Sequence, residues 1–213
     1  MKTVLAVDSA GPVVGACLLS GEEEFGWSER VGRGADTALI PAMADLLTQT
    51  HQVDLVAVTV GPGAFTGLRV GVAAALGVAV ARKVPVVCVS SLEARASLHV
   101  GESVLALLDA RKSRVYAQWF DCSGSFPVAR NEAVDAKLTS VFPSVPFVAV
   151  GEGALLDPDL IRSVGGRMCA DPAQSAAPAV GRLARIRSGT AMAADEVALA
   201  YLRDADAQKP APK

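Results

Sequence analysis

Hydrophobic residues at the start of the chain form short continuous runs that are separated by turn residues. Residues 2–10 read as a strand that ends in an acidic turn at Asp8, and a glycine-proline turn connects it to a second apolar run over residues 13–19. A further run near residues 25–31 would complete a three-stranded meander. The chain is therefore predicted to open with a β-sheet.

The spacing of apolar residues then becomes helical. A helix is predicted over residues 37–49, where the apolar positions at helical spacing are Leu39, Ile40, Met43, Leu46 and Leu47. Residues 55–60 form a nearly continuous apolar run, which is typical of a strand buried on both faces of a sheet. An apolar helix over residues 68–83 and a strand over residues 84–89 follow. The order β-β-β-α-β-α-β predicts a mixed sheet covered by helices.

A glycine-rich turn over residues 61–71 connects the buried strand to the apolar helix. Gly61 and Gly63 permit backbone angles that other residues avoid, and the free amides after Thr66 would point outward. The turn matches neither the phosphate loop, which requires a lysine, nor the dinucleotide-binding glycine pattern. Two interpretations stay open: a site for an anion, or a tight corner whose glycines allow close packing.

The helix after this turn carries no charge from residue 70 to residue 81. One side should lie on the sheet, and a second stripe of small apolar residues includes Val70, Ala74, Gly77 and Val78. The run is too short for a bilayer, which needs roughly 20 apolar residues, so no membrane role is expected. A covering element or a partner subunit is the favoured interpretation.

The second half of the chain repeats the opening in a reduced form. Residues 103–111 resemble the first strand and carry Asp109 where that strand carries Asp8, and residues 114–120 supply the hairpin partner. The predicted remainder is a strand near residues 128–134, a short helix, a strand over 147–150, a Gly-Glu-Gly turn, and helices over 178–187 and 195–203. We predict a first lobe of residues 1–98 plus 190–206, a smaller second lobe of residues 99–189, and a frayed tail of residues 207–213.

Composition narrows the function classes. The 213 residues are 51% hydrophobic and 20% charged, as in a globular protein, and the net charge of -2 argues against a broad basic face that grips RNA. The four cysteines form no Cys-x-x-Cys pair, so they are read as small core residues of a reducing compartment. They are Cys17, Cys88, Cys122 and Cys169. The first 20 residues lack the pattern of an export signal, so a cytoplasmic protein is expected.

Two halves that each open on a strand ending in aspartate are the layout of a known α/β class. It is the ribonuclease-H-like class of actin, sugar kinases and heat-shock chaperone ATPases, here with a reduced second half. Five motifs narrow the resemblance further: residues 61–71, the Leu-Ala-Val-Asp-Ser opening, the Asp-Ala-Arg at 109–111 with the Val-Tyr at 115–116, the Val-Gly-Glu-Gly turn at 150–153, and the Tyr-Leu-Arg at 201–203. With these motifs the chain resembles the TsaB (YeaZ) family over almost its whole length.

The resemblance implies a function that the residues alone do not. Members of this family are bacterial accessory proteins for the N6-threonylcarbamoyladenosine (t6A) modification of tRNA at adenosine 37. They are similar to a shortened, inactive copy of the transferase subunit TsaD, and they pair with TsaD through helices of the first half. The interface positions implied here are Leu39, Met43, Leu46, Val70, Ala73, Ala74, Gly77 and Val78. The alternative that these side chains only fill the core of this chain stays open, above all for the first helix.

The same resemblance implies the other partners. A homodimer would use the same helices when TsaD is absent. An ATPase, TsaE, would join the pair, with ATP bound at the junction of the complex and no cofactor in this chain alone. Contact with tRNA would be indirect.

The sequence supports inactivity on chemical grounds of its own. The only histidines, His51 and His99, are far apart in sequence, whereas a helical metal site needs two imidazoles one turn apart. The turn after Asp8 lacks a lysine or threonine cluster that would neutralise phosphates. Relic nucleotide contacts are expected at Asp8, Ser9, Asp109, Gly151 and Gly153, and for Asp8 a plain strand-end turn is an equal alternative. Arg111 and Tyr116 are read as structural. Serine, cysteine and metal peptidase patterns are absent.

The chain departs from the family pattern at three positions, Ala35, Ala64 and Leu199, where histidine, serine and proline are common. These departures bear most on the predicted interface. Three functions stay open: an accessory subunit of the transferase, a small ATP-dependent kinase of the same fold, and a nucleotide-sensing homodimer. The missing phosphate-neutralising residues and the thin second half favour the first.

Overall fold

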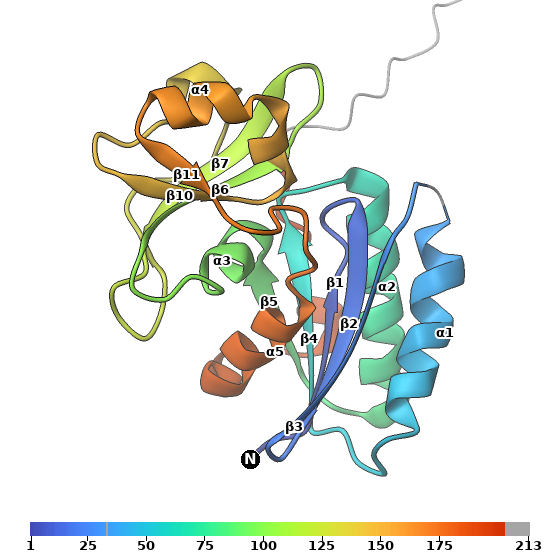
Figure 1. Cartoon of the computed structure of the whole chain (residues 1–213). Helices are drawn as coiled ribbons and strands as arrows, with labels where there is room; N and C mark the ends of the chain where they lie inside the picture. Colours follow the sequence, from blue (N-terminus) through green and yellow to red (C-terminus); the bar gives the residue numbers. More distant parts are fainter. Residues whose placement is uncertain (33, 203–213) are drawn as a thin grey trace, which may run out of the picture.

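The computed structural model describes residues 1–32 and 34–202, which form two α/β lobes stacked end to end (Figure 1). The first lobe contains a five-stranded sheet in the order β3-β2-β1-β4-β5. Its strands are β1 (Val4–Asp8), β2 (Val13–Ser20), β3 (Glu23–Arg30), β4 (Leu55–Gly61) and β5 (Val86–Ser90). The predicted opening meander and the buried fourth strand are confirmed.

The sheet of the first lobe is mixed because the chain enters β1 between two neighbours of opposite direction. β1 pairs antiparallel with β2 and parallel with β4, and β4 pairs parallel with β5. Every residue of β1 and β4 is buried, which agrees with their continuous apolar sequence. The carboxyl ends of β1 and β4 therefore meet at one edge, where the second lobe begins.

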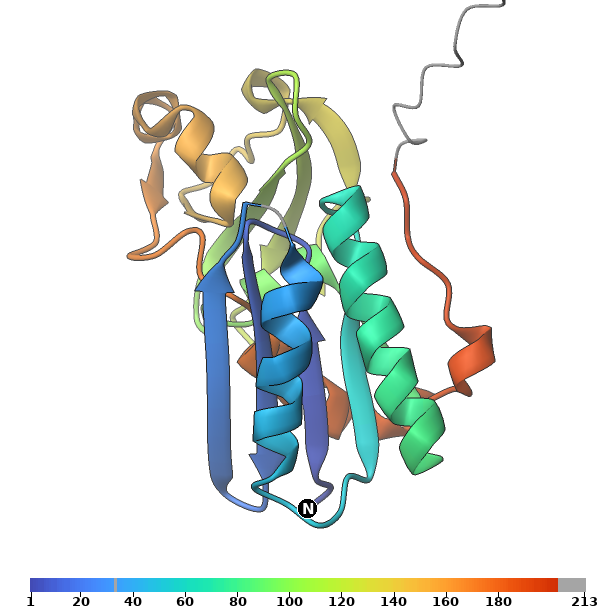
Figure 2. The same cartoon turned by 90° about the vertical axis from the view of Figure 1, so that its right-hand side faces the viewer.

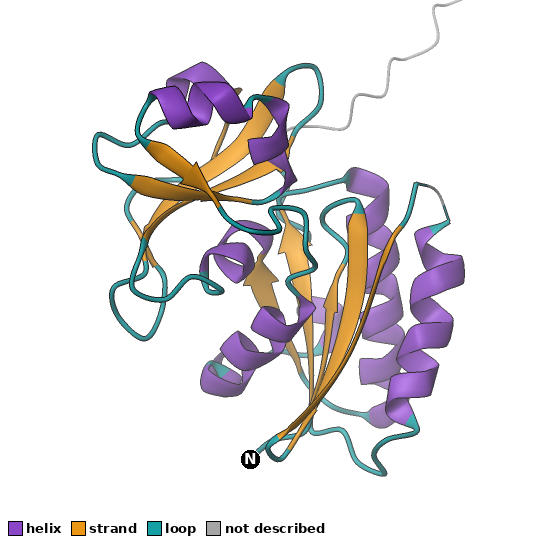
Figure 3. Ribbon diagram, viewed as in Figure 1, coloured by secondary structure: helices purple, strands orange, loops and turns teal. Residues whose placement is uncertain are grey.

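Helices cover both faces of this sheet (Figures 2 and 3). α1 (Ala35–Leu47) and α2 (Phe65–Arg82) lie on one face, and α5 (Ala177–Ile186) lies on the other. α3 (Ser91–Ala96) follows β5 and contacts β6 of the second lobe. The predicted helices over residues 37–49 and 178–187 are confirmed, each starting slightly earlier than expected.

The predicted lobe boundary needs correction at α5. The sequence reasoning placed residues 99–189 in the second lobe, but α5 packs on β1 and β2 of the first. Val180 and Leu183 of α5 bury their side chains against Leu19 and other residues of the sheet. This face of the first sheet is as apolar as the other, so it requires a covering helix, and α5 supplies it.

The second lobe is built on a six-stranded sheet in the order β11-β10-β6-β7-β8, with β9 also paired to β7. Its strands are β6 (Ser103–Asp109), β7 (Arg114–Asp121), β8 (Val128–Ala129), β9 (Val134–Lys137), β10 (Phe147–Val150) and β11 (Gly166–Met168). The helical segments are η1 (Leu138–Ser140), η2 (Glu152–Leu156) and α4 (Pro158–Ser163). The single strand expected near residues 128–134 is two short strands, and the duplicated, reduced second half is confirmed.

Residues 191–202, which we call the C-terminal strap, return to the first lobe. The helix predicted over residues 195–203 is wrong: after η3 (Ser188–Thr190) the strap contains only the single turn η4 (Ala194–Glu196). Its backbone instead pairs with Val86 of β5 and donates from the Ala200 amide to the Val60 carbonyl at 2.8 Å. Backbone hydrogen bonds to β4 and β5 thus replace helical ones. The predicted packing on the first half is confirmed, and the predicted tail at 207–213 lies outside the described residues.

Candidate functional site

The glycines of the turn after β4 serve close packing. Gly61 adopts φ +125°, and a Cβ there would overlap the Ala200 carbonyl oxygen of the strap. A Cβ on Gly63 would overlap the backbone of Ala10, whose carbonyl accepts from the Ala64 amide at 2.8 Å. Of the two interpretations that the sequence left open, the tight corner therefore explains these glycines.

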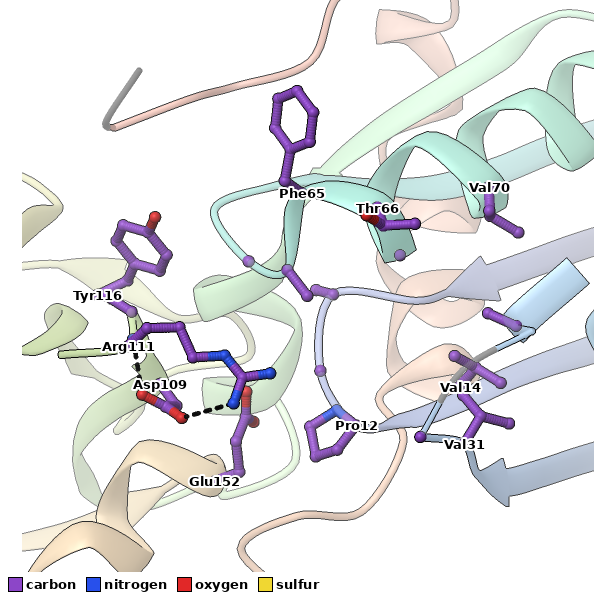
Figure 4. Close-up of a pocket in the computed structure, with 18 of the residues that line it drawn as sticks. Pro12, Val14, Val31, Phe65, Thr66, Val70, Asp109, Arg111, Tyr116 and Glu152 are labelled. Carbon is purple, nitrogen blue, oxygen red and sulfur yellow. Dashed lines mark hydrogen bonds and ion pairs between the residues drawn. The ribbon is translucent and has the colours of Figure 1, made fainter. Parts of the chain in front are cut away.

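This corner forms one wall of a cleft of about 790 Å³ between the two lobes (Figure 4). The first lobe contributes the turn after β1, the start of α1 and the first turn of α2, including Gly11, Phe65 and Thr66. The second lobe contributes the β6–β7 turn and the start of η2. Its polar lining residues are Asp109, Arg111, Tyr116 and Glu152.

Asp109 organises the turn on the second-lobe side. Its Oδ1 accepts from the Arg111 amide at 2.7 Å, and its Oδ2 lies 3.6 Å from the Arg111 guanidinium. Three successive residues, from Arg111 to Ser113, have positive φ, so the carboxylate holds a strained hairpin turn together. Arg111 is 80% exposed, and its side chain extends into the cleft near Glu152 (Figure 4). The structural role predicted for Arg111 fits this arrangement.

Asp8 is fully buried and its oxygens are engaged. Oδ1 accepts from the Thr59 hydroxyl at 3.0 Å and from the Ala10 amide at 3.3 Å. Oδ2 accepts from the Ala176 amide at 2.9 Å and pairs with Arg95 at 3.2 Å. Because its oxygens already have these partners, Asp8 does not fit as a ligand of a metal-bound nucleotide in this chain, and the strand-end interpretation agrees with its contacts.

The other predicted relic contacts also have packing roles. Ser9 is buried against α2, where its hydroxyl has no hydrogen-bond partner among the described residues. Gly151 has φ +89°, and a Cβ on it would overlap the Leu107 carbonyl oxygen. A Cβ on Gly153 would lie equally close to the Leu107 and Leu108 backbones. These glycines let η2 approach β6, which brings Glu152 to the cleft.

Two charged residues at the base of the cleft were missed by the sequence reasoning. Arg95 of α3 is 3% exposed, and Glu152, which stood only as part of a turn motif, is 11% exposed. Burial raises the pKa of Glu152, and the nearby Asp8 carboxylate raises it further, whereas the Arg95 guanidinium opposes this shift. The sequence shows Arg95 only as one of two charged residues, with Glu93, in the short segment of residues 92–96, and no pattern there marks it as a site residue.

The histidines and cysteines do not gather into a common metal-binding or catalytic cluster among the described residues. His51 is exposed in the loop after α1, and burial lowers the pKa of the half-buried His99. Cys17, Cys122 and Cys169 are buried, as predicted, and Cys88 is half-buried. Burial raises the pKa of Cys17 to about 12 and that of Cys122 to about 11, so these thiols stay protonated near neutral pH.

Figure 2 shows the outer side of α1 and α2, and the side chains of these two helices form a groove that we call the helix-pair groove. It has a volume of about 370 Å³ and is lined by Ile40, Met43, Ala44, Leu47, Ala74, Gly77, Val78, Ala81 and Arg82. α2 has 18 residues and a mean hydropathy of 1.4, enough by length and composition alone to cross a membrane, yet only 28% of it is buried. Its apolar residues are divided between the sheet and this groove.

The predicted interface residues do not all lie on one surface. Leu39, Met43 and Leu46 are buried in the core under α1, with exposed fractions of 0%, 3% and 8%, although Met43 also borders the helix-pair groove. Met43, Ala74, Gly77 and Val78 line the helix-pair groove, Ala73 is exposed, and Val70 lines the interlobe cleft. Ile40, which is 54% exposed, takes the place on α1 that the sequence reasoning gave to Leu39.

Comparison with solved structures defines the class of protein. YeaZ from Pseudomonas aeruginosa superimposes with a TM-score of 0.80 over 95% of this chain and 100% of that chain, at 24% sequence identity. At this identity the likeness shows the fold. Together with the two lobes and the cleft at their strand ends, it places the chain in the actin-like α/β class. The fold class predicted from the sequence is therefore confirmed.

Sequence comparison defines the family. Residues 33–139 match the family model "TsaD: tRNA N6-adenosine threonylcarbamoyltransferase". The tRNA threonylcarbamoyladenosine biosynthesis protein TsaB of Haemophilus influenzae is 35% identical over 54% of this chain and 52% of its own length. The Escherichia coli protein of that name is 28% identical over 76% of each chain. The chain belongs to the TsaB (YeaZ) family, and its match spans about half the length of the Haemophilus relative.

Proposed function

We propose that this protein is a non-catalytic accessory subunit in the t6A modification of tRNA at adenosine 37. In this role it binds a TsaD-type transferase subunit and activates it. The names of the Haemophilus and Escherichia relatives support the pathway, and the apolar helix-pair groove supports a role in binding. Because the function is exercised on a partner, it requires no reactive group in this chain.

The helix-pair groove is the observation that carries the proposal. Ile40, which lines the groove, is 54% exposed, and the other lining residues are small or apolar except Arg82. A contiguous apolar surface of this kind is a common mark of a protein interface, because covering it removes apolar area from water. Small residues such as Ala74 and Gly77 would let a partner helix approach closely.

The kind of partner follows from the family match. The TsaD model matches residues 33–139, a range that includes both helices of the groove. A transferase subunit of the same fold would present an equivalent helix pair, so the two could pack around a pseudo-twofold axis as a helix bundle. A second copy of this chain presents the same face, and a homodimer is therefore the competing assembly when the transferase is absent.

The remaining parts of the assembly follow from the same role. The ATPase TsaE would join the pair, with ATP bound at the junction of the complex and tRNA held by the transferase subunit. The engaged state of Asp8 supports a site outside this chain's own cleft. The proposed location is the cytoplasm, where tRNA is modified.

The test is t6A formation on tRNA by the purified transferase subunit and its ATPase, with and without this protein. Ala74→Arg would place a charged side chain in the helix-pair groove, so we expect it to reduce both complex formation and activity at least tenfold. Ser125→Arg adds the same charge to an exposed loop of the second lobe and should change neither. Full activity without this protein, or with Ala74→Arg bound normally, would contradict the proposal.

A further inference from the structure

Three charged side chains from three separate segments meet beneath the cleft. Asp8 ends β1 of the first lobe, Arg95 lies on α3, and Glu152 begins η2 of the second lobe. Arg95 Nη2 is 3.2 Å from Asp8 Oδ2, and Arg95 Nε is 4.0 Å from Glu152 Oε2. All three are largely buried, with exposed fractions of 0%, 3% and 11% for Asp8, Arg95 and Glu152. One guanidinium therefore lies between carboxylates from both lobes.

The position of the guanidinium is fixed from its own element. Arg95 Nη1 donates to the Ser91 carbonyl oxygen at 3.0 Å, one turn earlier in α3. α3 itself is held to α5 of the first lobe, because Arg187 donates to both oxygens of Glu93. Since α3 also packs against β6, it lies between the two lobes (Figure 1). The cation is thus held on a short rigid element at their junction.

The turn after β1 is shaped around this cation. A Cβ on Gly11 would lie 3.0 Å from Glu152 Oε2 and 3.2 Å from Arg95 Nη2. The first-lobe backbone therefore approaches both charged groups as closely as packing allows. Glu152 reaches this place because Gly151 and Gly153 permit η2 to lie against β6. Contacts from both lobes consequently converge on one guanidinium.

An apolar layer continues the junction beside these charges. Ala10 and Leu68 of the first lobe, Leu92 and Ala96 of α3, and Leu108 of the second lobe belong to one buried cluster. Buried ion pairs are costly to break from one side, because the remaining charge is left in a poorly solvated place. Separation of the lobes would expose this cluster and leave Glu152 without its cation.

We propose that Arg95 is an internal cation that joins Asp8 of the first lobe to Glu152 of the second and fixes the separation of the lobes. Because the guanidinium is covalently part of the chain, the cleft keeps one width and does not close around a metal-bound nucleotide. This inference is independent of the proposed accessory function.

The experiment measures the distance between the lobes in solution. Spin labels are attached to cysteines introduced at Ser28 of β3 and Thr139 of the second lobe, both exposed, in a Cys88→Ala background that removes the half-buried thiol. Pulsed electron spin resonance then gives the distribution of distances. We expect a single narrow distribution for the parent chain that does not change when ATP and Mg²⁺ are added.

Variants separate the internal cation from general stability. Arg95→Met and Glu152→Ala should broaden the distribution at least twofold, and Arg95→Lys, which keeps the charge, should broaden it less than Arg95→Met. Arg182→Met removes the exposed pair with Glu24 within the first lobe, away from α3, so it should leave the width unchanged even if it lowers stability.

Equal widths for the parent, Arg95→Met and Glu152→Ala would overturn the proposal, and so would a shift of the parent distribution on adding ATP and Mg²⁺. If Arg95→Met does not fold, Glu152→Ala and Arg95→Lys decide the question by themselves. A loss of t6A formation with unchanged distances would bear on the accessory function alone, so failure of the two proposals can be distinguished.

Discussion

At the scale of single residues, the charged cluster beneath the cleft contains two carboxylates and one guanidinium. Asp8 and Glu152 share Arg95, which lies closer to Asp8, and the Asp109 backbone amide also faces Glu152. Two buried carboxylates with one cation cannot both be fully stabilised, so the pKa of Glu152 is raised. Glu152 is the group through which this site should respond to pH.

The first prediction concerns that response. Because the pKa of Glu152 is raised in the folded chain, the native state binds a proton that the unfolded state has lost, and stability falls as pH rises from about 4.5 through the raised pKa. Glu152→Gln cannot titrate. Its free energy of unfolding, relative to the parent, should therefore increase with pH in this window, by at most about 1.4 kcal/mol per pH unit. Urea denaturation at a series of pH values measures it, and a difference independent of pH would contradict the raised pKa.

The sequence alone marks Asp8 and Asp109 as candidate site residues, because each ends an apolar strand. Arg95 could not be found in the same way. It is separated from Asp8 by 87 positions and from Glu152 by 57, as their numbers show, and no local pattern connects them. Only the folded chain shows that they share one buried site.

At the scale of elements, α2 shows how glycine has opposite roles within one helix. Gly67, in the first turn, lies against the Ser9 carbonyl, so that a Cβ would overlap it. Gly77, in the helix-pair groove, has open space around it. The sequence presents both simply as glycines in an apolar helix, and their neighbours distinguish them.

The second prediction is a matched pair of substitutions in α2. Gly67→Ala should lower the free energy of unfolding by about 1–3 kcal/mol, because the added methyl must displace the β1–β2 turn. Gly77→Ala should raise it by about 1 kcal/mol, because alanine is the better helix former and nothing opposes the methyl. Thermal and urea unfolding of the isolated chains give both values. Equal effects at the two positions would show that the helix does not pack on the turn as described.

The start of α2 carries one of the three positions at which the chain departs from the family pattern. Ala64 occupies the position before the helix with φ -62° and ψ 116°, and no side chain caps the first turn. The serine that is common there could accept a hydrogen bond from a first-turn amide. The departure at Ala64 therefore concerns the stability of α2 and not a reactive group.

At the scale of the whole molecule, the C-terminal strap contacts segments that are distant from it in sequence. Leu199 packs against the core under α1 and α2 and also against the junction cluster between the lobes. The strap also supplies the backbone partners of Val60 and Val86. A segment without regular secondary structure thus completes the first lobe.

The third prediction tests this role of the strap. Leu199→Ala should lower the free energy of unfolding by about 1–2 kcal/mol, because it removes apolar contacts to two clusters at once. Val100→Ala, at a position 70% exposed, should change it by less than about 0.5 kcal/mol. Chemical denaturation with both variants makes the comparison. A negligible effect of Leu199→Ala would mean that the strap contributes little to the stability of the fold.

The sequence by itself determined the order of elements, the two halves that each open on an aspartate-terminated strand, and the apolar character of α2. These features follow from local spacing, because strands and helices impose periods of two and 3.6 residues on any buried face. The TsaB family resemblance rested on local motifs for the same reason.

Only the tertiary structure decided which apolar residues of α1 face the core, that α5 belongs to the first lobe, and that the strap is extended. It also placed Arg95 between Asp8 and Glu152. Each of these depends on contacts between distant segments, whose energies exceed local propensity and leave no periodic trace in the sequence. An exposed leucine and a buried leucine are identical in the sequence, and only the residues that pack against them in the folded chain decide which one is buried.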